Sequence, residues 1–348
     1  MSTRVSNREG NNLNDPSPVL SVVIPCYNEE EVLPVTAERL TSMLSQMKAE
    51  GLISENSFLL FVDDGSKDKT WQIIGSLAQE QPMIHGIKLA HNAGHQNALF
   101  AGLMEAKKQA DCVISIDADL QDDVDVMREF LQRYKKGFEI VYGVRKSRAS
   151  DTFFKRTTAE GFYRFMRAMG VQIVFNHADY RLLSRRALEY LEEYRERNLF
   201  LRGIIPLLGL KSTTVYYDRH ERYAGQSKYP LRKMLAFAFE GITSFSVTPI
   251  RFVTLMGFSI FIISIAAGLY ALWSKLAGRS ISGWTSLMLS IWFIGGINLM
   301  SIGLIGEYIG KIYLETKQRP RYLIEERLAP FPQSPQRDTS YEKMGSHS

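Results

Sequence analysis

The sequence predicts an α/β fold, with a doubly wound sheet domain followed by a pair of long apolar helices. Short apolar, β-branched runs alternate with helical patterns in the N-terminal half, and each run ends in polar residues. Two stretches without charged residues lie near the C-terminus. A chain of 348 residues is long enough for one large domain with an appendage.

Composition excludes several classes of protein. The net charge of +5 is modest for this length, so nucleic acid is not expected as a partner. Cys26 and Cys112 lie in runs typical of buried strands, so free core thiols in a reducing compartment are expected rather than disulfides. Residues 1–18 are polar and lack the apolar core of a secretory signal, so they are expected to form a disordered lead-in.

The sheet domain is expected over residues 19–230. Its first four strands are predicted from apolar runs at 19–26, 58–62, 86–89 and 112–116, with helical patterns at 70–78 and 96–108. In doubly wound domains the ligand binds beyond the carboxyl ends of the strands, so the polar residues that follow each run should converge on one crevice. No GxGxxG or GxxxxGK[ST] pattern occurs at these turns, which argues against a standard dinucleotide site or P-loop.

The most informative local sequence is Asp117-Ala118-Asp119-Leu120-Gln121, at the end of the fourth predicted strand. Two neighbouring carboxylates repel one another unless a cation lies between them. Oxygen ligands with open positions suit Mg²⁺ or Mn²⁺, which would bridge to a diphosphate and neutralise charge as it departs. Taken alone, the pair is equally compatible with a solvated turn.

Two other strand ends carry candidate ligand-binding residues. Asp63 and Asp64 close the second strand, where a carboxylate can accept hydrogen bonds from a base or ribose, although Asp-Gly-Ser is also a common turn. Tyr27 follows the first strand, where it could stack on a base, although the Asn-Glu-Glu after it is also a normal helix start.

The apolar stretches at 252–272 and 284–306 contain no charged residue, and each is long enough to span a bilayer as a helix. They predict a transmembrane hairpin over 251–313, and a pair of buried core helices is the alternative. Basic residues flank the pair outside its connecting loop, which places both termini and the sheet domain in the cytoplasm by the positive-inside rule: Arg232, Lys233 and Arg251 before it, and Lys311, Lys317, Arg319 and Arg321 after it.

Other segments near the hairpin carry weaker signals. Residues 231–250 are predicted to form an amphipathic helix at the membrane interface, and an ordinary surface helix fits equally well. Gly306 and Gly310 form a GxxxG pattern, which leaves a homo-oligomer open. Residues 314–348 are expected to form a cytoplasmic tail that is disordered at its end.

Several segments, in this order, resemble the inverting family 2 glycosyltransferases of the GT-A, Rossmann-like fold. The resemblance rests on Val22-Val23-Ile24-Pro25-Cys26-Tyr27-Asn28-Glu29, Val62-Asp63-Asp64-Gly65-Ser66 and Asp117-Ala118-Asp119-Leu120-Gln121. Further motifs are similar to polyprenyl-phosphate glycosyltransferases, namely Asn92-Ala93-Gly94-His95, Gly143-Val144-Arg145, Asp179-Tyr180-Arg181-Leu182, the segment 222–229 and the segment 306–313. Bacterial undecaprenyl-phosphate glucosyltransferases are the most similar group, and dolichol-phosphate mannose synthases are more distant.

This resemblance implies roles for individual residues. The metal would be held by Asp117, Asp119 and Gln121, and catalysis would involve Asp119, Asp179, Arg222 and Lys228. The nucleotide sugar would be bound by Pro25, Tyr27, Glu29, Asp63 or Asp64, Asn92, Asp117 and Gln121. The acceptor phosphate would be bound by Arg145, Arg148 and Arg156, although an ordinary membrane-facing basic patch is an equal alternative for the last two. The family often has a serine shortly after the last of these arginines, where this chain has Thr157, Thr158 and Ala159.

The implied activity is inverting transfer of a hexose, best matched by glucose from UDP-glucose, onto undecaprenyl or another polyprenyl phosphate. The product would be a lipid-linked sugar for modification of cell-envelope glycans, made at the cytoplasmic face of a bacterial inner membrane. A phosphate acceptor is largely anionic at neutral pH, so Asp179 is expected to orient an arginine or the acceptor, and the base role stays open.

Other functions compete with this interpretation. N-acetylhexosamine, a modified aminopentose and mannose are alternative donor sugars. More remote alternatives are a processive polysaccharide synthase, whose [QR]xxRW motif is absent from the sequence, and a non-enzymatic sensor of nucleotide sugars.

Overall fold

The structure is a computed structural model that describes residues 17–145, 177–197, 199–218, 248–277 and 283–328. The strands are β1 (Leu20–Cys26), β2 (Phe58–Asp63), β3 (Ile84–Leu89), β4 (Cys112–Ser115), β5 (Ile140–Arg145), β6 (His177–Ser184), β7 (Ser212–Tyr217) and β8 (Ile324–Leu328). The helices are α1 (Leu33–Ala49), α2 (Thr70–Glu80), α3 (His95–Ala106), α4 (Val126–Lys135), α6 (Arg185–Glu192), α7 (Leu201–Leu207), α9 (Thr248–Leu276) and α10 (Trp284–Thr316).

The strands form one sheet in the order β7-β5-β6-β4-β1-β2-β3-β8. Its centre, β4-β1-β2-β3, is parallel, and these are the four strands that the apolar runs predicted. Two strands differ from the expected parallel pattern, because β6 runs antiparallel to both β4 and β5, and β8 runs antiparallel to β3. The sheet is therefore mixed, with a parallel core that carries the predicted ligand-binding edge.

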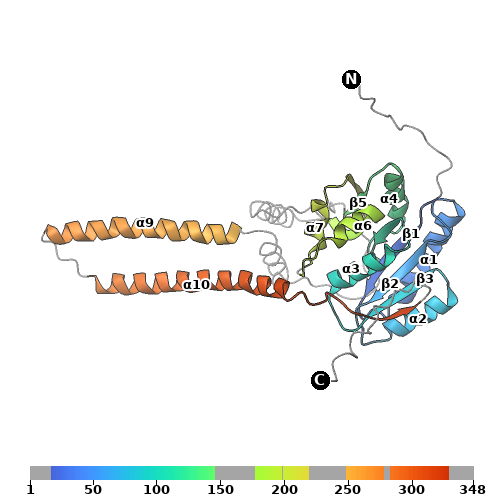
Figure 1. Cartoon of the computed structure of the whole chain (residues 1–348), viewed down its shortest axis with the longest axis horizontal. Coiled ribbons are helices and arrows are strands. Elements are labelled where there is room, and N and C mark those ends of the chain that lie inside the picture. Colours follow the sequence, from blue (N-terminus) through green and yellow to red (C-terminus); the bar gives the residue numbers. More distant parts are fainter. Residues whose placement is uncertain (1–16, 146–176, 198, 219–247, 278–282, 329–348) are drawn as a thin grey trace, which may run out of the picture.

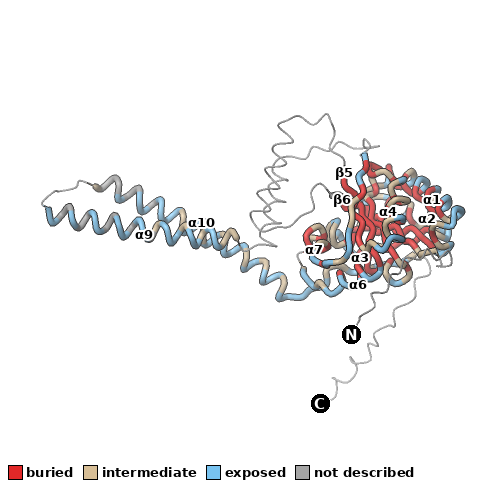
Figure 2. The backbone as a smooth tube through the Cα atoms, turned by 90° about the horizontal axis from the view of Figure 1, so that it is seen from above, coloured by how far each residue is buried: buried red, intermediate tan, exposed pale blue. Residues whose placement is uncertain are grey.

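Helices cover both faces of the sheet, as the doubly wound prediction requires (Figure 1). One core cluster joins the sheet to α1, α2 and α4, and a second joins the opposite face to α3, α6 and α7. Figure 2 shows the buried strands between the two helix layers. The buried, unpaired Cys26 and Cys112 lie in this core, as expected.

Helix α3 packs very closely on the parallel strands because of a glycine. A Cβ atom at Gly102 would lie 2.4 Å from Cγ1 of Val23 and 2.7 Å from Cγ2 of Val62. Real Cβ atoms do not approach so closely, so a larger residue would push α3 off the sheet. The close approach keeps the N-terminus of α3 fixed relative to the ends of β1 and β2.

Strand β6 interrupts the apolar pattern typical of this sheet. Tyr180 and Leu182 pack into the core on the α4 side, whereas Arg181 and Leu183 alternate with them along the strand. Arg181 is only 1% exposed, so the strand buries a charged side chain within the domain. Because such a charge requires compensation, Arg181 needs an anionic partner close to β6.

Helices α9 and α10 lie side by side and extend away from the sheet domain as a hairpin (Figures 1 and 2). Many of their apolar side chains are exposed, including Phe258, Leu269 and Met300. Among the described residues, Phe293–Thr316 is long and apolar enough to cross a membrane, and Thr248–Ile260 is a shorter apolar helix. The apolar part of this longer segment is not buried in the protein. The alternative of a buried core helix is therefore wrong for Phe293–Thr316.

The chain returns to the sheet after the hairpin. Strand β8 pairs with β3, and its acidic side chains reach neighbouring elements, with Trp71 Nε1 donating to Glu326 Oε2 at 3.0 Å and Lys88 Nζ lying 2.9 Å from Glu325 Oε2. The sequence did not predict this strand, which falls in the expected tail. Most of the expected interfacial helix at 231–250, the lead-in at 1–16 and the end of the tail at 329–348 lie outside the described residues.

Candidate active site

The loops that follow β1 and β2 are joined by hydrogen bonds. The amide of Asn28 donates to Ser66 Oγ at 3.0 Å, the amide of Glu29 donates to Thr70 Oγ1 at 2.9 Å, and the amide of Lys67 donates to Asn28 Oδ1 at 2.9 Å. Tyr27 stands at this junction with 41% of its surface exposed, so its ring is available to a ligand. Pro25 lies buried within β1, so its side chain is not presented in the same way.

The structure distinguishes between the two carboxylates that end β2. Asp64 accepts hydrogen bonds from the amides of Ala93 at 2.7 Å and Gly94 at 3.0 Å, so it holds the loop between β3 and α3. Asp63 accepts longer bonds from the amide of Ser66, at 3.3 and 3.4 Å, and the side chain of Ser66 is also hydrogen-bonded to it. Burial raises the pKa of both groups, and these hydrogen bonds oppose the rise. Asp63 is therefore held by longer backbone hydrogen bonds than Asp64, and both carboxylates are buried.

Gly65 allows the two loops to touch. Its φ is +67°, and an added Cβ would lie 2.8 Å from the backbone nitrogen of Asn92. Both features exclude other residues without a shift of the backbone. Asn92 itself is exposed, beside the ends of β1 and β2.

The acidic turn after β4 has an unusual backbone. Leu120 has a φ of +54°, which is rare for a branched residue, and the amide of Gln121 donates to Asp119 Oδ1 at 3.2 Å. Thr36 Oγ1 donates to the carbonyl of Ala118 at 2.7 Å, which ties the turn to α1. Backbone outliers of this kind concentrate at functional sites, where the surrounding structure holds them in place.

Asp117 lies in an acidic environment. Its burial raises its pKa to about 6, with Asp179, Asp122 and Asp119 adding to the rise and His95 opposing it. His95 Nε2 lies 3.7 Å from Asp117 Oδ1. A cation beside this carboxylate would relieve the repulsion that raises its pKa.

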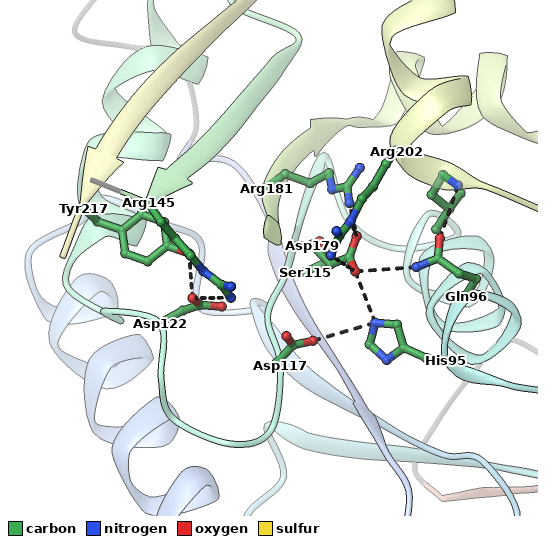
Figure 3. Close-up of polar contacts among 11 residues, drawn as sticks. His95, Gln96, Ser115, Asp117, Asp122, Arg145, Asp179, Arg181, Arg202 and Tyr217 are labelled. Carbon is green, nitrogen blue, oxygen red and sulfur yellow. Dashed lines mark hydrogen bonds and ion pairs between the residues drawn. The ribbon is translucent and has the colours of Figure 1, made fainter. Parts of the chain in front are cut away.

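Asp179, on β6, collects several donors at the same edge of the sheet (Figure 3). Arg202 Nε and Nη2 donate to its two oxygens at 3.2 and 3.0 Å, and Arg181 Nη2 also donates to Oδ1. His95 Nε2 lies 3.4 Å from Oδ2, and Gln96 Nε2 donates to the same oxygen at 3.5 Å. We call this group, Asp179, Arg181, Arg202, His95 and Gln96, the Asp179 cluster.

The electrostatics of the Asp179 cluster favour an ionised carboxylate. Burial alone would raise the pKa of Asp179, but His95, Arg181 and Arg202 outweigh it and hold the pKa well below its usual range. Burial alone would lower the pKa of His95, and the two carboxylates beside it raise it above its ordinary value instead. Arg181 Nε and Nη1 are buried and have no hydrogen-bond partner among the described residues.

A second cluster, which we call the Asp122 cluster, lies beyond the acidic turn (Figure 3). Arg145 Nη2 donates to Asp122 Oδ1 at 3.1 Å, and the hydroxyl of Tyr217 donates to the same oxygen at 2.5 Å. The other oxygen, Oδ2, is buried, and no residue in the described part of the chain bonds to it. Arg145, predicted to receive the acceptor phosphate, is thus engaged by a carboxylate and is 24% exposed.

The structure describes most of the predicted site residues. Asp117, Asp119 and Gln121 follow β4, and Asp179 lies near the start of β6. Asp63 ends β2 and Asp64 follows it, while Tyr27, Glu29 and Asn92 lie on the loops after β1 and β3. Pro25 lies within β1, and Arg145 ends β5. Arg148, Arg156, Arg222 and Lys228 lie outside the described residues.

The sequence assigned no role to several residues that the structure places at the site. His95 and Arg181 belong to motifs that carried the resemblance, and the motif itself was the signal for them. Arg202 is a lone charge in the apolar run Leu201-Arg202-Gly203-Ile204-Ile205, which is a usable signal. Nothing in the sequence pointed to Tyr217.

The acidic turn fits a divalent cation only with help from a ligand. Among the described residues, no group of three or more His, Cys, Asp and Glu side chains could hold a metal ion. Mg²⁺ commonly binds one or two carboxylates together with waters and substrate phosphates, which matches Asp117 and Asp119. Burial is the main cause of the raised pKa of Asp117, and the neighbouring carboxylates add a repulsion that such a cation would offset.

Comparisons with known proteins agree on the class of this chain. Residues 21–191 match the model for glycosyl transferase family 2, and residues 248–312 match that for the GtrB C-terminal hairpin. The uncharacterized glycosyltransferase YkoT of Bacillus subtilis is 57% identical over 319 residues, which cover 90% of this chain and 95% of that protein.

A relative with a named activity and a solved structure also match. The bactoprenol glucosyl transferase of Shigella phage SfX is 39% identical over 310 residues, which cover 88% of this chain and 99% of that protein. The crystal structure of mannosyl-3-phosphoglycerate synthase from Rubrobacter xylanophilus has a TM-score of 0.44 and 15% identity, and covers 64% of this chain and 71% of its own.

Proposed function

Because this chain belongs to glycosyl transferase family 2 and carries a GtrB-type hairpin, we propose that it transfers glucose from UDP-glucose onto undecaprenyl or another polyprenyl phosphate. The reaction would make a lipid-linked sugar for cell-envelope glycans. The name of the phage relative supports both the glucosyl group and the lipid acceptor.

One observation carries the proposal beyond the family. A single edge of the sheet brings an acidic turn, Asp117 to Asp119, next to a cluster in which Arg181 and Arg202 share one carboxylate. The acidic turn suits the metal and diphosphate of a donor, and the arginines suit a second anion. Transfer from a nucleotide sugar to a phosphate needs both kinds of site side by side.

The donor would bind at the acidic turn and the neighbouring loops. Tyr27 would stack on the base, Asp63 would accept from the base or ribose, and Asp117, Asp119 and Gln121 would face the metal and diphosphate. A bound divalent cation would neutralise the charge that develops on the departing diphosphate. Asp64 would act by positioning the loop that carries Asn92.

Transfer would proceed by in-line displacement with inversion. The second pKa of a phosphate monoester is about 6, so the acceptor oxygen is largely anionic at neutral pH and needs no strong base. The depressed pKa of Asp179 argues further against proton removal by this carboxylate. Asp179 would instead orient Arg181 and Arg202.

The fold supports a membrane hairpin with both ends on one side. Strand β7 precedes α9 and β8 follows α10, yet both strands belong to one sheet. The chain must therefore leave and re-enter the sheet domain on the same side of any bilayer, which requires an even number of crossings. Together with the basic residues that flank the hairpin, this supports two crossings of a bacterial inner membrane and a cytoplasmic sheet domain.

The test is incorporation of labelled sugar into lipid. Purified full-length protein in detergent would be incubated with undecaprenyl phosphate, Mg²⁺ or Mn²⁺ and labelled UDP-glucose, and the label in the organic phase would be counted. Labelled UDP-N-acetylglucosamine, a UDP-aminopentose and GDP-mannose form a parallel panel. Label from UDP-glucose alone supports the proposal, label from another donor alone corrects the sugar, and no label from any donor overturns it.

The matched variant is Asp119→Ala. We predict that it loses at least about 100-fold in metal-dependent turnover, since electrostatic stabilisation of a leaving group is worth several kcal/mol. Arg186→Gln, on the exposed surface of α6, is the control and should retain wild-type turnover. Full turnover of Asp119→Ala, or of the wild type in excess chelator, would contradict the metal assignment.

A further inference from the structure

The Asp179 cluster carries more positive charge than its own carboxylate compensates. Arg181 and Arg202 both pair with Asp179, so the three side chains have a net positive charge. Buried charges need partners, and two nitrogens of Arg181 have none within the described ranges of the chain.

Of the two arginines in the cluster, Arg202 is the one that can reach a ligand. Its side chain is 33% exposed, whereas that of Arg181 is 1% exposed. The hydrogen bonds to Asp179 use Nε and Nη2 and leave the Nη1 group for another acceptor. A guanidinium held in this way on one edge is already oriented, so little conformational entropy is lost when its other edge binds an anion.

Arg202 lies on α7, close to the end of the sheet domain from which the hairpin extends. Helix α7 lies on the hairpin side of the sheet domain in both views (Figures 1 and 2). The segment that leads into α7 is fixed to the last turn of α10, because the amide of Arg197 donates to the two oxygens of Glu315 at 2.7 and 2.8 Å. Arg321, just after α10, also donates to the carbonyl of Tyr194 in the same segment.

We propose that Arg202, clamped by Asp179 and supported by the buried charge of Arg181, binds the phosphate group of the lipid acceptor. This inference rests on the proposed function and deepens it, since it names the residue that receives the acceptor. Arg145, by comparison, is tied to Asp122 and Tyr217 on the far side of the acidic turn. His95 lies close to both Asp117 and Asp179, the carboxylate that binds Arg202. A phosphate bound to the free edge of Arg202 would therefore adjoin the donor site.

The chemical step is balanced without a proton acceptor. A non-bridging oxygen of the dianionic lipid phosphate forms the bond to the anomeric carbon. The bond between that carbon and the diphosphate oxygen breaks, and its electron pair leaves with the nucleoside diphosphate. Arg202 stays protonated throughout, so its contribution is to bind and orient the attacking group.

Steady-state kinetics of Arg202→Gln test the proposal. The Michaelis constant for the acceptor should rise about 10- to 100-fold, since a charge-assisted hydrogen bond of this kind is lost. The Michaelis constant for the donor should stay within about twofold. Arg202→Lys should give an intermediate loss because lysine keeps the charge but not the two-point hold on Asp179. Arg186→Gln is again the matched surface control.

Two acceptors separate the phosphate from the lipid chain. Undecaprenyl phosphate and water-soluble farnesyl phosphate should lose affinity for Arg202→Gln by the same factor, because Arg202 contacts only the phosphate. A loss confined to undecaprenyl phosphate would overturn the proposal in favour of a contact with the chain. A rise in the donor constant with an unchanged acceptor constant would assign Arg202 to the diphosphate instead.

A binding measurement gives a readout that does not depend on turnover. Farnesyl phosphate without donor should raise the melting temperature of the wild type and of Arg186→Gln, and should not raise that of Arg202→Gln. If Arg202→Gln is too unstable to melt cooperatively, Arg202→Lys replaces it, and equal stabilisation of that variant and the wild type would overturn the proposal. Absence of labelled lipid with the wild type defeats the parent function, whereas labelled lipid with unchanged variants defeats only this inference.

Discussion

The Asp179 cluster and the Asp122 cluster each use a buried carboxylate to hold an arginine, but they do so differently. Both oxygens of Asp179 are engaged, by two arginines, a glutamine and a histidine. Asp122 accepts from Arg145 and Tyr217 on one oxygen, and its other oxygen is buried with no hydrogen-bond partner in the part of the chain that the structure describes. The first cluster is short of negative charge, and the second is short of a hydrogen-bond donor.

This difference indicates different tasks. A saturated carboxylate fixes its arginines in one geometry, which suits the recognition of an anion. A carboxylate with an unpartnered oxygen can accept one more hydrogen bond, for example from a hydroxyl or a water brought in with substrate. The acidic turn lies between the two clusters, so Asp117 experiences the negative charge of both Asp179 and Asp122.

Among variants that compare the two clusters, Asp179→Ala is expected to lower the free energy of unfolding the most. Removing one partner of a buried ion pair typically costs about 3–5 kcal/mol, and here two arginines would lose their carboxylate. Denaturant unfolding followed by the fluorescence of the sheet domain would measure the loss. Asp122→Ala should cost distinctly less because it leaves one arginine, with 24% of its side chain exposed. Equal losses would show that the two clusters do not differ as described.

A second prediction concerns pH and the carboxylate between the clusters. The pKa of Asp117 is raised to about 6 in the folded protein, so the metal-free protein binds this proton more tightly than the unfolded chain does. The protonated Asp117 therefore contributes to the free energy of unfolding at low pH, and this contribution is lost as the pH rises from about 4 through about 6. Asp117→Asn should flatten this part of the stability profile of the metal-free protein.

The same proton competes with a metal ion. Below pH of about 6, the apparent affinity for Mn²⁺ should fall by up to about tenfold per pH unit, because the proton must leave before the cation binds. Titration of Mn²⁺ by electron paramagnetic resonance at several pH values would measure this. If the apparent affinity for Mn²⁺ did not change between about pH 5 and about pH 7, the assignment of Asp117 as a ligand would be contradicted.

The smallest effect is expected from Tyr217→Phe. The hydroxyl donates to Asp122 Oδ1 at 2.5 Å, and its loss leaves that carboxylate with Arg145 as its remaining donor. Loss of a hydrogen bond to a charged group costs about 1.5–3 kcal/mol, below the loss expected for Asp179→Ala. A thermal melt would measure it. A destabilisation larger than that of Asp179→Ala would reverse the ranking of the two clusters.

Much of the fold followed from the sequence for a specific reason. Central parallel strands are buried on both faces, so they read as continuous apolar runs, and β1 to β4 were predicted with ends within two residues of those observed. Strand β6 escaped prediction because Asp179 and Arg181 interrupt its apolar pattern. Strand β8 reads Ile-Glu-Glu-Arg-Leu, and such charged composition is typical of the edge of a sheet and gives little strand signal.

The site was predictable only where residue type and position both carried information. The turn at Asp117 and Asp119 combines two carboxylates with the end of a buried strand, and this placement is what favoured a ligand site over a solvated turn. The separate tasks of Asp63 and Asp64 depend on which backbone amides each one reaches, and no sequence pattern encodes that. Arg202 lies 23 residues from its partner Asp179, so only the folded chain shows that they meet.

Strand β8 also sets an order of events during synthesis. The ribosome makes β1 to β7 first, then α9 and α10, and only then the residues 324–328 that pair with β3. Until that moment the edge of β3 is an open template for unwanted pairing with other chains. A nascent chain thus completes its sheet only after its hairpin has been made, and a chain cut short after α10 should be prone to aggregate through that edge.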